Sequence, residues 1–345
     1  MKNDDSSKNA DWTRRQMLAA LAASAGAAVA GVSQAKEIAK DPTKIPGAAP
    51  SKLGARSVFE SPERIAAFGV ISGTPLHELH GTLTPSDLHF ERHHAGIPSI
   101  DPGSHELLIH GLVERPLKLT LADLLRFPAV SRIAFLECSG NLQIDAGEET
   151  TPQSLCGLTS QSEWTGVALS TLLREVGLRP NARWLLAEGS DAAVLSRSIP
   201  IEKAMDDAIV AYAQNGEALR PGQGYPIRLF LPGWEGNANV KWLRRIEVSD
   251  RAFMTREETS KYSEPIKGGT IRAFSFTMDA RSVITTPTYP RNLERGWHEI
   301  RGLAWSGRGR ITKVEVSVDG GRNWQDARLA GPVLAKAHTR FTLPW

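Results

Sequence analysis

The segment AFLECSGN, residues 134–141, joins a strand-like apolar run to a turn of small and polar residues. Cys138 stands at that junction and is one of only two cysteines in the 345-residue chain. Mixed α/β sheets place their ligands at strand ends, and small residues such as Gly140 let a ligand come close to the backbone. The segment therefore marks Cys138 as a candidate ligand or nucleophile in a fold of strands and helices.

Further strand-like segments surround this one, each bounded by glycine, proline, asparagine or aspartate. They are HELLIHGLV (105–113), SRIAFLEC (131–138), WLLAEGSD (184–191), AIVAYAQNG (208–216), YPIRLFLPG (225–233) and VKWLRRIEVSD (240–250). Helices are predicted over 120–128, with Thr120 as N-cap, and over 169–178, with Ser170 as N-cap and Gly177 at its end.

From about residue 265 the pattern becomes that of a β-sandwich. The stretch 298–329 alternates apolar and polar residues, and we expect Val314, Val316 and Val318 on one face before a turn at Asp319-Gly320-Gly321. Since about 80 residues follow the boundary and such a domain usually needs about 100, we expect this sandwich to be C-terminally incomplete.

Four parts are therefore predicted along the chain. They are a signal peptide over 1–35, a linker or arm over 36–58, a catalytic domain over 59–262 and a partial sandwich over 263–345. The 30 glycines and 21 prolines indicate a loop-rich α/β or all-β fold and not a helical bundle. The formal net charge of +3 is too small and dispersed to indicate nucleic-acid binding.

The N-terminal segment resembles a twin-arginine export signal. Arg14 and Arg15 precede QMLAALAASAGAAVAGV and the small-residue site SQA. A transmembrane anchor is the alternative, but the run is short and consists mainly of alanine and glycine, which suits a bilayer span of ~20 residues poorly. We expect a periplasmic protein without a membrane span.

Three interpretations of Cys138 compete at this point. A disulfide with Cys156 suits an oxidising compartment, a buried inert thiol is common, and a soft metal ligand or nucleophile suits the strand end. A zinc site is not indicated, because the chain has no CxxC and neither cysteine has a histidine pair near it at the spacing of zinc ligands. The loop HFERHHAGIP (89–98) and the stretch 222–242, with Arg228 and Lys241, supply cations that suit an anionic cofactor with a soft metal.

From about residue 60 the chain resembles the sulfite oxidase family of molybdenum enzymes, and within it the molybdenum subunits of Sox-type sulfane (sulfite) dehydrogenases. The motifs that carry the resemblance are FERHHAGIP (90–98), LECSGN (136–141), EGSD (188–191), GYPIRLFLPGWEGNANVKWLRRIEV (224–248) and GLAWSGRGRITKVEVSVDGGRNW (302–324). The resemblance implies an α+β fold in which a molybdopterin-binding domain precedes an Ig-like dimerisation domain.

The resemblance also implies a molybdenum-molybdopterin cofactor with Cys138 as the metal ligand. Arg92 and Tyr262 match residues beside the substrate and the metal, and together with Cys138 they form the predicted catalytic set. The predicted cofactor-binding set is Phe90, Arg92, His93, His94, Asp191, Gln223, Arg228, Asn239, Val240 and Lys241.

Several positions depart from the animal and plant sulfite oxidases. Gln143 replaces a second substrate arginine, Gln223 replaces a pterin-binding histidine, and the tryptophan of the sulfite pocket has no match in SLCGLTSQ (154–161). A further family arginine falls after residue 345 in the alignment of motifs. These differences favour sulfane sulfur held on a carrier protein over free sulfite as the substrate.

The chain contains no CxxCH, so a c-type cytochrome subunit is the expected electron acceptor. A homodimer core in a heteromer is expected where the sandwich is complete. The alternatives are a free-sulfite dehydrogenase, a periplasmic methionine-sulfoxide reductase, and a cofactor-free binding protein with a Cys138–Cys156 disulfide.

Overall fold

The computed structural model describes residues 46–66, 69–142 and 151–345. Contacts divide the chain into a unit from Met1 to Ser61 and a compact unit from Pro62 to Trp345. In the first unit, the described residues 46–61 form no helix or strand. The predicted signal peptide with Arg14 and Arg15 lies outside the described residues.

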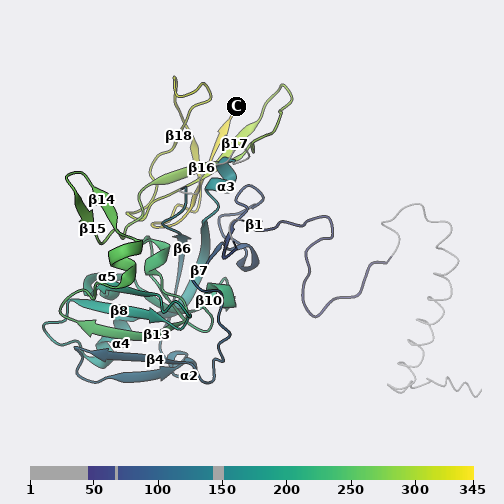
Figure 1. The fold of residues 1–345 in the computed structure, drawn as a ribbon. Coiled ribbons are helices and arrows are strands. Elements are labelled where there is room, and N and C mark those ends of the chain that lie inside the picture. Colours follow the sequence, from purple (N-terminus) through teal and green to yellow (C-terminus); the bar gives the residue numbers. More distant parts are fainter. Residues whose placement is uncertain (1–45, 67–68, 143–150) are drawn as a thin grey trace, which may run out of the picture. The chain divides into compact units, whose positions relative to one another are not determined.

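The second unit contains two five-stranded sheets (Figure 1). One has the order β5-β4-β13-β8-β9, with β5 Leu117–Thr120, β4 Glu106–Gly111, β13 Leu243–Ser249, β8 Trp184–Gly189 and β9 Ser196–Pro200. The other has the order β11-β10-β7-β6, with β12 also paired to β10; its strands are β11 Glu217–Ala218, β10 Ile209–Gln214, β7 Thr159–Ala168, β6 Ala129–Glu137 and β12 Arg228–Phe230. Each of the six predicted strands has its counterpart here; five lie within the predicted segments, whereas β6 begins at Ala129, before the predicted start at residue 131.

The helices are short and lie between strands. They are α2 Leu121–Leu124, α3 Pro152–Leu155, α4 Leu169–Val176 and α5 Ile201–Asp206, with single turns η2 Ser86–Leu88, η3 Pro221–Gln223, η4 Gly236–Ala238 and η5 Glu257–Lys261. Thr120 caps α2 as predicted, in a capping box with Asp123. The predicted cap at Ser170 is wrong, because α4 begins at Leu169, whose N–H instead donates to the Ala208 carbonyl across the fold.

The main core is built from residues of both five-stranded sheets and of the helices. Leu107 and Ile109 of β4 are fully buried while their strand neighbours are less so, which is the period-two pattern of a strand with one face inward. The core continues through Leu172 and Leu173 of α4 and Leu229 of β12.

The end of β6 is buried on both faces. Leu136 packs with Phe90 and Trp164 in one cluster, whereas Phe135 packs with Trp305 in another. Because side chains alternate along a strand, Glu137 follows Phe135 toward the C-terminal region and Cys138 follows Leu136 toward Phe90.

The C-terminal region forms the Ig-like sandwich. Its four-stranded sheet has the order β16-β17-β21-β20, with β16 Arg281–Thr286, β17 Glu299–Trp305, β21 Thr339–Pro344 and β20 Arg328–Ala330. The hairpin of β18 Glu315–Val316 and β19 Gln325–Asp326 packs on it, since Val316 shares a cluster with β17 and β21 residues. Smaller pairings are β1 Ile65–Ala66 with β2 Ile71–Gly73 and β3 Glu91–Arg92, and β14 Glu264–Ile266 with β15 Thr270–Arg272.

The predicted common face of Val314, Val316 and Val318 is only partly correct. Val316 is buried, but Val318 is 41% exposed. The strand ends at Val316 because Ser317 Oγ donates to Asp319 Oδ1 at 2.8 Å and accepts the Gly321 N–H, which turns the chain early.

Candidate cofactor site

Cys138 follows the last residue of β6 and is held in a closed turn. Its N–H donates to the Leu158 carbonyl at 3.0 Å, and its own carbonyl accepts the Asn141 N–H at 2.9 Å. Gly236 of η4 approaches this turn so closely that a Cβ there would lie 2.8 Å from the Glu137 oxygen and 3.2 Å from the Cys138 Cα. A glycine is therefore required where the η4 loop meets the cysteine.

Both cysteines are free thiols, so the disulfide alternative is not realised. Burial raises the pKa of Cys138, although the Gly140 N–H and the charge of Arg92 act in the opposite direction. Burial also raises the pKa of Cys156 to about 11, and its side chain packs in the cluster with Phe135 and Trp305. Cys138, in contrast, lines a cavity.

That cavity has about 620 Å³ of empty space, the open solvent at its mouth included. We call it the inner cavity. Besides Cys138, the predicted site residues that line it are Phe90, Arg92, His93, His94, Asp191, Gln223, Arg228, Asn239, Lys241 and Tyr262. Segments that are distant in the sequence thus line the same cavity.

Val240 is placed differently. Its side chain is fully buried in the main core and does not line the inner cavity. Its carbonyl accepts the Leu229 N–H at 2.8 Å. A role for Val240 in cofactor binding stays a prediction, and its side chain does not face the cavity.

Arg228 is a buried cation, 1% exposed, without a carboxylate contact among the described residues. Its Nη1 and Nη2 donate to the carbonyls of Gln223 and Asn239, both at 3.0 Å. Its Nε has no hydrogen-bond partner within the described chain. Burial lowers the pKa of Arg228 to about 9, which expresses the cost of a guanidinium that lacks a counter-ion.

Lys241 lies in the same wall. Its Nζ donates to the carbonyls of Arg92 at 3.1 Å and Gly222 at 3.0 Å, and lies 2.7 Å from His93 Nδ1. Burial, and then the neighbouring charge of Arg228, lowers the pKa of Lys241 well below its usual range. Among the charged residues that line the inner cavity, three are cations and one, Asp191, is an anion, so the formal charge is +3 − 1 = +2.

Tyr262 and His94 meet across the cavity mouth. The Tyr262 hydroxyl lies 2.8 Å from His94 Nε2. Burial raises the pKa of Tyr262 to about 12 and lowers that of His94 to about 4. At neutral pH the tyrosine is thus protonated and the imidazole is neutral, and the two side chains share one hydrogen bond.

A second, outer cavity adjoins the first at Arg92, Cys138 and Tyr262. It holds about 1130 Å³, open solvent included. Its remaining lining residues come from the cysteine turn, from the N-cap of η4, from 261–265 and from the start of the sandwich, namely Ser139, Gly140, Glu235, Lys261, Ser263, Glu264, Pro265, Ser275, Thr277, Met278, Asp279 and Arg281. Cys138 therefore lies between a cationic pocket and an open, polar cavity.

The structure also locates the departures noted in the sequence. Gln223 lies in the inner cavity wall, where its Nε2 donates to the Phe90 carbonyl at 2.8 Å. No residue of 154–161 lines either cavity. Gln143 lies outside the described residues.

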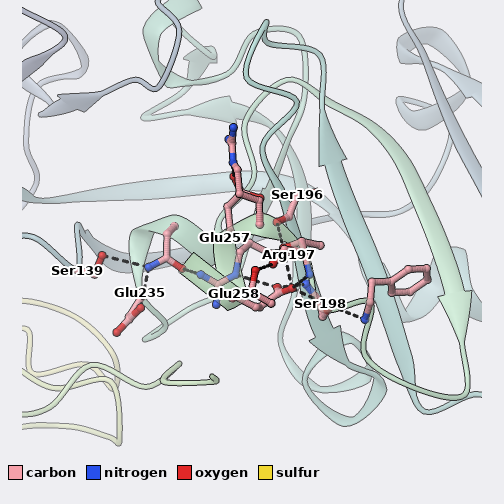
Figure 2. Close-up of polar contacts among 12 residues, drawn as sticks. Ser139, Ser196, Arg197, Ser198, Glu235, Glu257 and Glu258 are labelled. Carbon is pink, nitrogen blue, oxygen red and sulfur yellow. Dashed lines mark hydrogen bonds and ion pairs between the residues drawn. The ribbon is translucent and has the colours of Figure 1, made fainter. Parts of the chain in front are cut away.

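The residues that support this site from behind were not predicted from the sequence. Figure 2 shows Arg197 of β9 between Glu258 and the η4 loop, and it is fully buried. Arg197 has a serine on each side in SRSIP (196–200), a local pattern that is typical of a strand residue facing solvent. Glu137 was missed as well: its carboxylate accepts Trp305 Nε1 at 2.7 Å, Asn141 Nδ2 at 2.8 Å and Arg281 Nη1 at 3.0 Å.

No cluster of three or more metal-ligating histidine, cysteine, aspartate or glutamate residues occurs in the described ranges. Cys138 is the cysteine that lines the inner cavity, and one soft thiolate suits a metal brought in by an organic cofactor. In the same part of the chain, no helix combines the length and apolarity that a bilayer crossing requires.

Two family models match the chain. Residues 94–257 match the oxidoreductase molybdopterin-binding domain, and residues 272–340 match the molybdenum-cofactor oxidoreductase dimerisation domain. The inner cavity fits molybdopterin on its own evidence. It carries a net positive charge for an anionic group, the Arg228 Nε is left for an acceptor, and the Cys138 sulfur is a soft metal ligand.

The chain is also similar to solved and curated proteins of this kind. The crystal structure of the sulfane dehydrogenase SoxCD from Paracoccus pantotrophus is 44% identical, with a TM-score of 0.84 over 89% of this chain and 85% of that one. The nitrate reductase [NADH] of Ulva prolifera is 32% identical over 71% of this chain and 32% of the relative. The mitochondrial sulfite oxidase of Rattus norvegicus is 31% identical over 76% of this chain and 52% of the relative.

The chain thus spans between about a third and about half of the length of these two curated relatives. The matched models, the structural similarity and the geometry of the inner cavity agree. The chain belongs to the sulfite oxidase family of molybdopterin-binding oxidoreductases.

Proposed function

We propose that the chain is the molybdenum-cofactor component of a periplasmic dehydrogenase that oxidises sulfane sulfur held on a carrier protein. Electrons would pass to the haem of a separate c-type cytochrome subunit. The similarity to the sulfane dehydrogenase SoxCD supports this substrate class. The observation that carries the proposal is the outer cavity beside Cys138.

The residues of the inner cavity would hold the cofactor. The Cys138 sulfur would bind the metal, and Arg228 and Lys241 would contact the phosphate and the polar edges of the pterin. When bound, the molybdenum cofactor supplies two-electron oxidation with transfer of an oxygen atom.

Arg92 and Tyr262 are the chain's own groups at the point where substrate arrives, because each lines both cavities. Arg92 Nη1 donates to the His93 carbonyl, which fixes its guanidinium at the mouth. Tyr262 keeps its proton and is held by its hydrogen bond with His94 Nε2 at 2.8 Å, and its O–H is free for the substrate in the tautomer in which His94 Nε2–H is the donor. We expect Arg92 to attract the anionic sulfur group and Tyr262 to donate a hydrogen bond to it.

The outer cavity suits a tethered substrate better than a free oxyanion. Its charged lining residues are Arg92, Lys261 and Arg281 against Glu235, Glu264 and Asp279, so the charges balance when all six are ionised; burial raises the pKa of Glu235 to about 7, which leaves at most one net positive charge near neutral pH. Without a larger excess of positive charge, a free sulfite ion gains little from the field of the cavity. A carrier arm gains from its own contacts with the polar lining.

Free sulfite oxidation is the second candidate. Arg92 lines both cavities, and its positive charge would attract a free oxyanion as well as a tethered one. The two functions differ in steady-state reduction of cytochrome c. The proposal expects turnover with a sulfur-loaded carrier protein and weak or no turnover with sulfite. Rapid sulfite turnover in the absence of the carrier would favour the second candidate.

Export is also part of the proposal. The twin arginines at Arg14 and Arg15 and the following alanine-rich run support translocation of a protein already folded around its cofactor. Replacing both arginines with lysine should keep the protein in the cytoplasm. Periplasmic recovery of that variant at the parent level would contradict the signal.

A further inference from the structure

Arg197 belongs to neither cavity, yet it is in contact with the elements that carry two predicted catalytic residues. Its side chain is fully buried on β9. The Nε lies 3.2 Å from Glu258 Oε1, and Nη1 donates to Asn237 Oδ1. The guanidinium carbon lies 5.4 Å from the centroid of the Tyr262 ring, within the range of a cation–π contact.

On one side, this cluster holds the turn before Tyr262. Glu258, also fully buried, accepts the N–H of Ser198 and the N–H of Thr255, both at 2.6 Å (Figure 2). Thr255 Oγ1 donates to the same carboxylate at 2.7 Å. The η5 turn, Glu257–Lys261, is thereby tied to β9, and Tyr262 follows it directly.

On the other side, the cluster reaches the cysteine turn. Asn237 Nδ2 donates to Ser139 Oγ at 3.1 Å and to Glu235 Oε2 at 2.7 Å. The same residue receives Arg197 Nη1 on its carbonyl oxygen. Since Ser139 is the residue after Cys138, a chain of two hydrogen bonds connects the buried guanidinium to the turn that presents the thiol (Figure 2).

We infer that Arg197 is a positioning residue that fixes Tyr262 and the Cys138 turn relative to each other across the outer cavity. Its planar fork suits this role, because it can pair with Glu258, donate to Asn237 and lie over the Tyr262 ring at the same time. A lysine carries the charge but not the fork. The inference rests on the proposed roles of Cys138 and Tyr262 and not on which sulfur compound is the substrate.

A purely structural role is the rival explanation, since a buried ion pair also supports the fold. The chain offers a matched control in Lys203 and Asp207, an ion pair of 2.6 Å with both side chains 7% exposed. Lys203 also lies 5.2 Å from an aromatic ring, that of Trp234, but lines neither cavity. Lys203→Met therefore removes a similar pair without touching the two turns.

The test is hydrogen–deuterium exchange, read by peptide, on the full chain loaded with cofactor. In Arg197→Lys we expect exchange to rise roughly tenfold, as one lost hydrogen bond of ordinary strength allows, in peptides covering 138–142 and 257–262 together. Asn237→Ala should affect the first segment alone, and Glu258→Gln the second alone. Lys203→Met should affect neither.

Exchange at the parent rate in both segments of Arg197→Lys would overturn the inference. So would a uniform increase that includes β4, because it would show general destabilisation. Should Arg197→Lys not fold, Asn237→Ala carries the test, and unchanged exchange at 138–142 in that variant would overturn the link to the cysteine turn. Turnover is measured alongside on the parent protein: rapid turnover of free sulfite there would contradict the proposed function, and the exchange result for Arg197 would stand or fall separately.

Discussion

Replacing Arg228 with methionine isolates the part of the site that binds an anion. Methionine keeps an unbranched side chain of moderate length but has neither charge nor donors. The hydrogen bonds from Nη1 and Nη2 to the Gln223 and Asn239 carbonyls are lost with and without cofactor. Their loss therefore cancels, to a first approximation, from the free energy of cofactor binding.

What remains is the contact that the free Nε and the charge of Arg228 make with the bound group. A hydrogen bond to a charged group contributes ~1.5–3 kcal/mol, which corresponds to a roughly 10- to 150-fold weaker cofactor affinity. When cofactor is limiting, the variant should contain much less molybdenum per chain than the parent. Metal analysis of purified protein by mass spectrometry measures this ratio.

Arg245→Met is the matched control. Arg245 also has an Nε without a hydrogen-bond partner within the described residues, but its Nη atoms pair with Glu188 at 2.6 Å and Glu247 at 3.0 Å, and it lines neither cavity. We expect parent-level molybdenum in this control. Equal occupancy of Arg228→Met and the parent under limiting cofactor would refute the anion-binding role.

Tyr262→Phe should keep molybdenum content but slow turnover, because it removes the hydroxyl that meets His94 at the cavity mouth; an unchanged kcat would place this tyrosine outside the chemistry. Trp305→Phe leaves Glu137 Oε2 without its 2.7 Å donor and should lower the free energy of unfolding by ~1.5–3 kcal/mol, read from urea denaturation. Burial raises the pKa of Glu235 to about 7, so the folded state binds the proton more tightly than the unfolded state. Protonated Glu235 therefore stabilises the fold at low pH, and this stabilisation is lost as the pH rises from about 4.5 through 7. Glu235→Gln should remove that loss, and identical pH profiles of thermal unfolding in the two proteins would contradict it.

The positions of the strands could be predicted from the sequence, whereas some of their ends and one helix cap could not. Strand positions followed from apolar runs that end in glycine or proline, and β6 with Cys138 at its end lies where it was expected. The Ser170 cap and the position of Val318 were wrong for a shared reason. In both cases a hydrogen bond set the terminus of the element: the Leu169 N–H bonds to the distant Ala208 carbonyl where α4 begins, and Ser317 bonds within the turn where β18 ends.

The cavity residues could be predicted because family motifs carry them, whereas their supports could not. Glu137 is adjacent to Cys138 but points to Trp305 of β17, a contact that only the packing of the sandwich against β6 creates. Arg197 reads locally as a solvated residue, and its burial depends on Glu258 and Asn237 reaching it from other segments. Local patterns do not encode such long-range pairs.

The central claim is that the Cys138 sulfur binds the molybdenum of the cofactor. X-ray absorption at the molybdenum edge on the parent and on Cys138→Ser counts the sulfur atoms around the metal. The account predicts comparable molybdenum content in both proteins and one sulfur neighbour fewer in the variant. The same sulfur count in both, at equal molybdenum content, would contradict it.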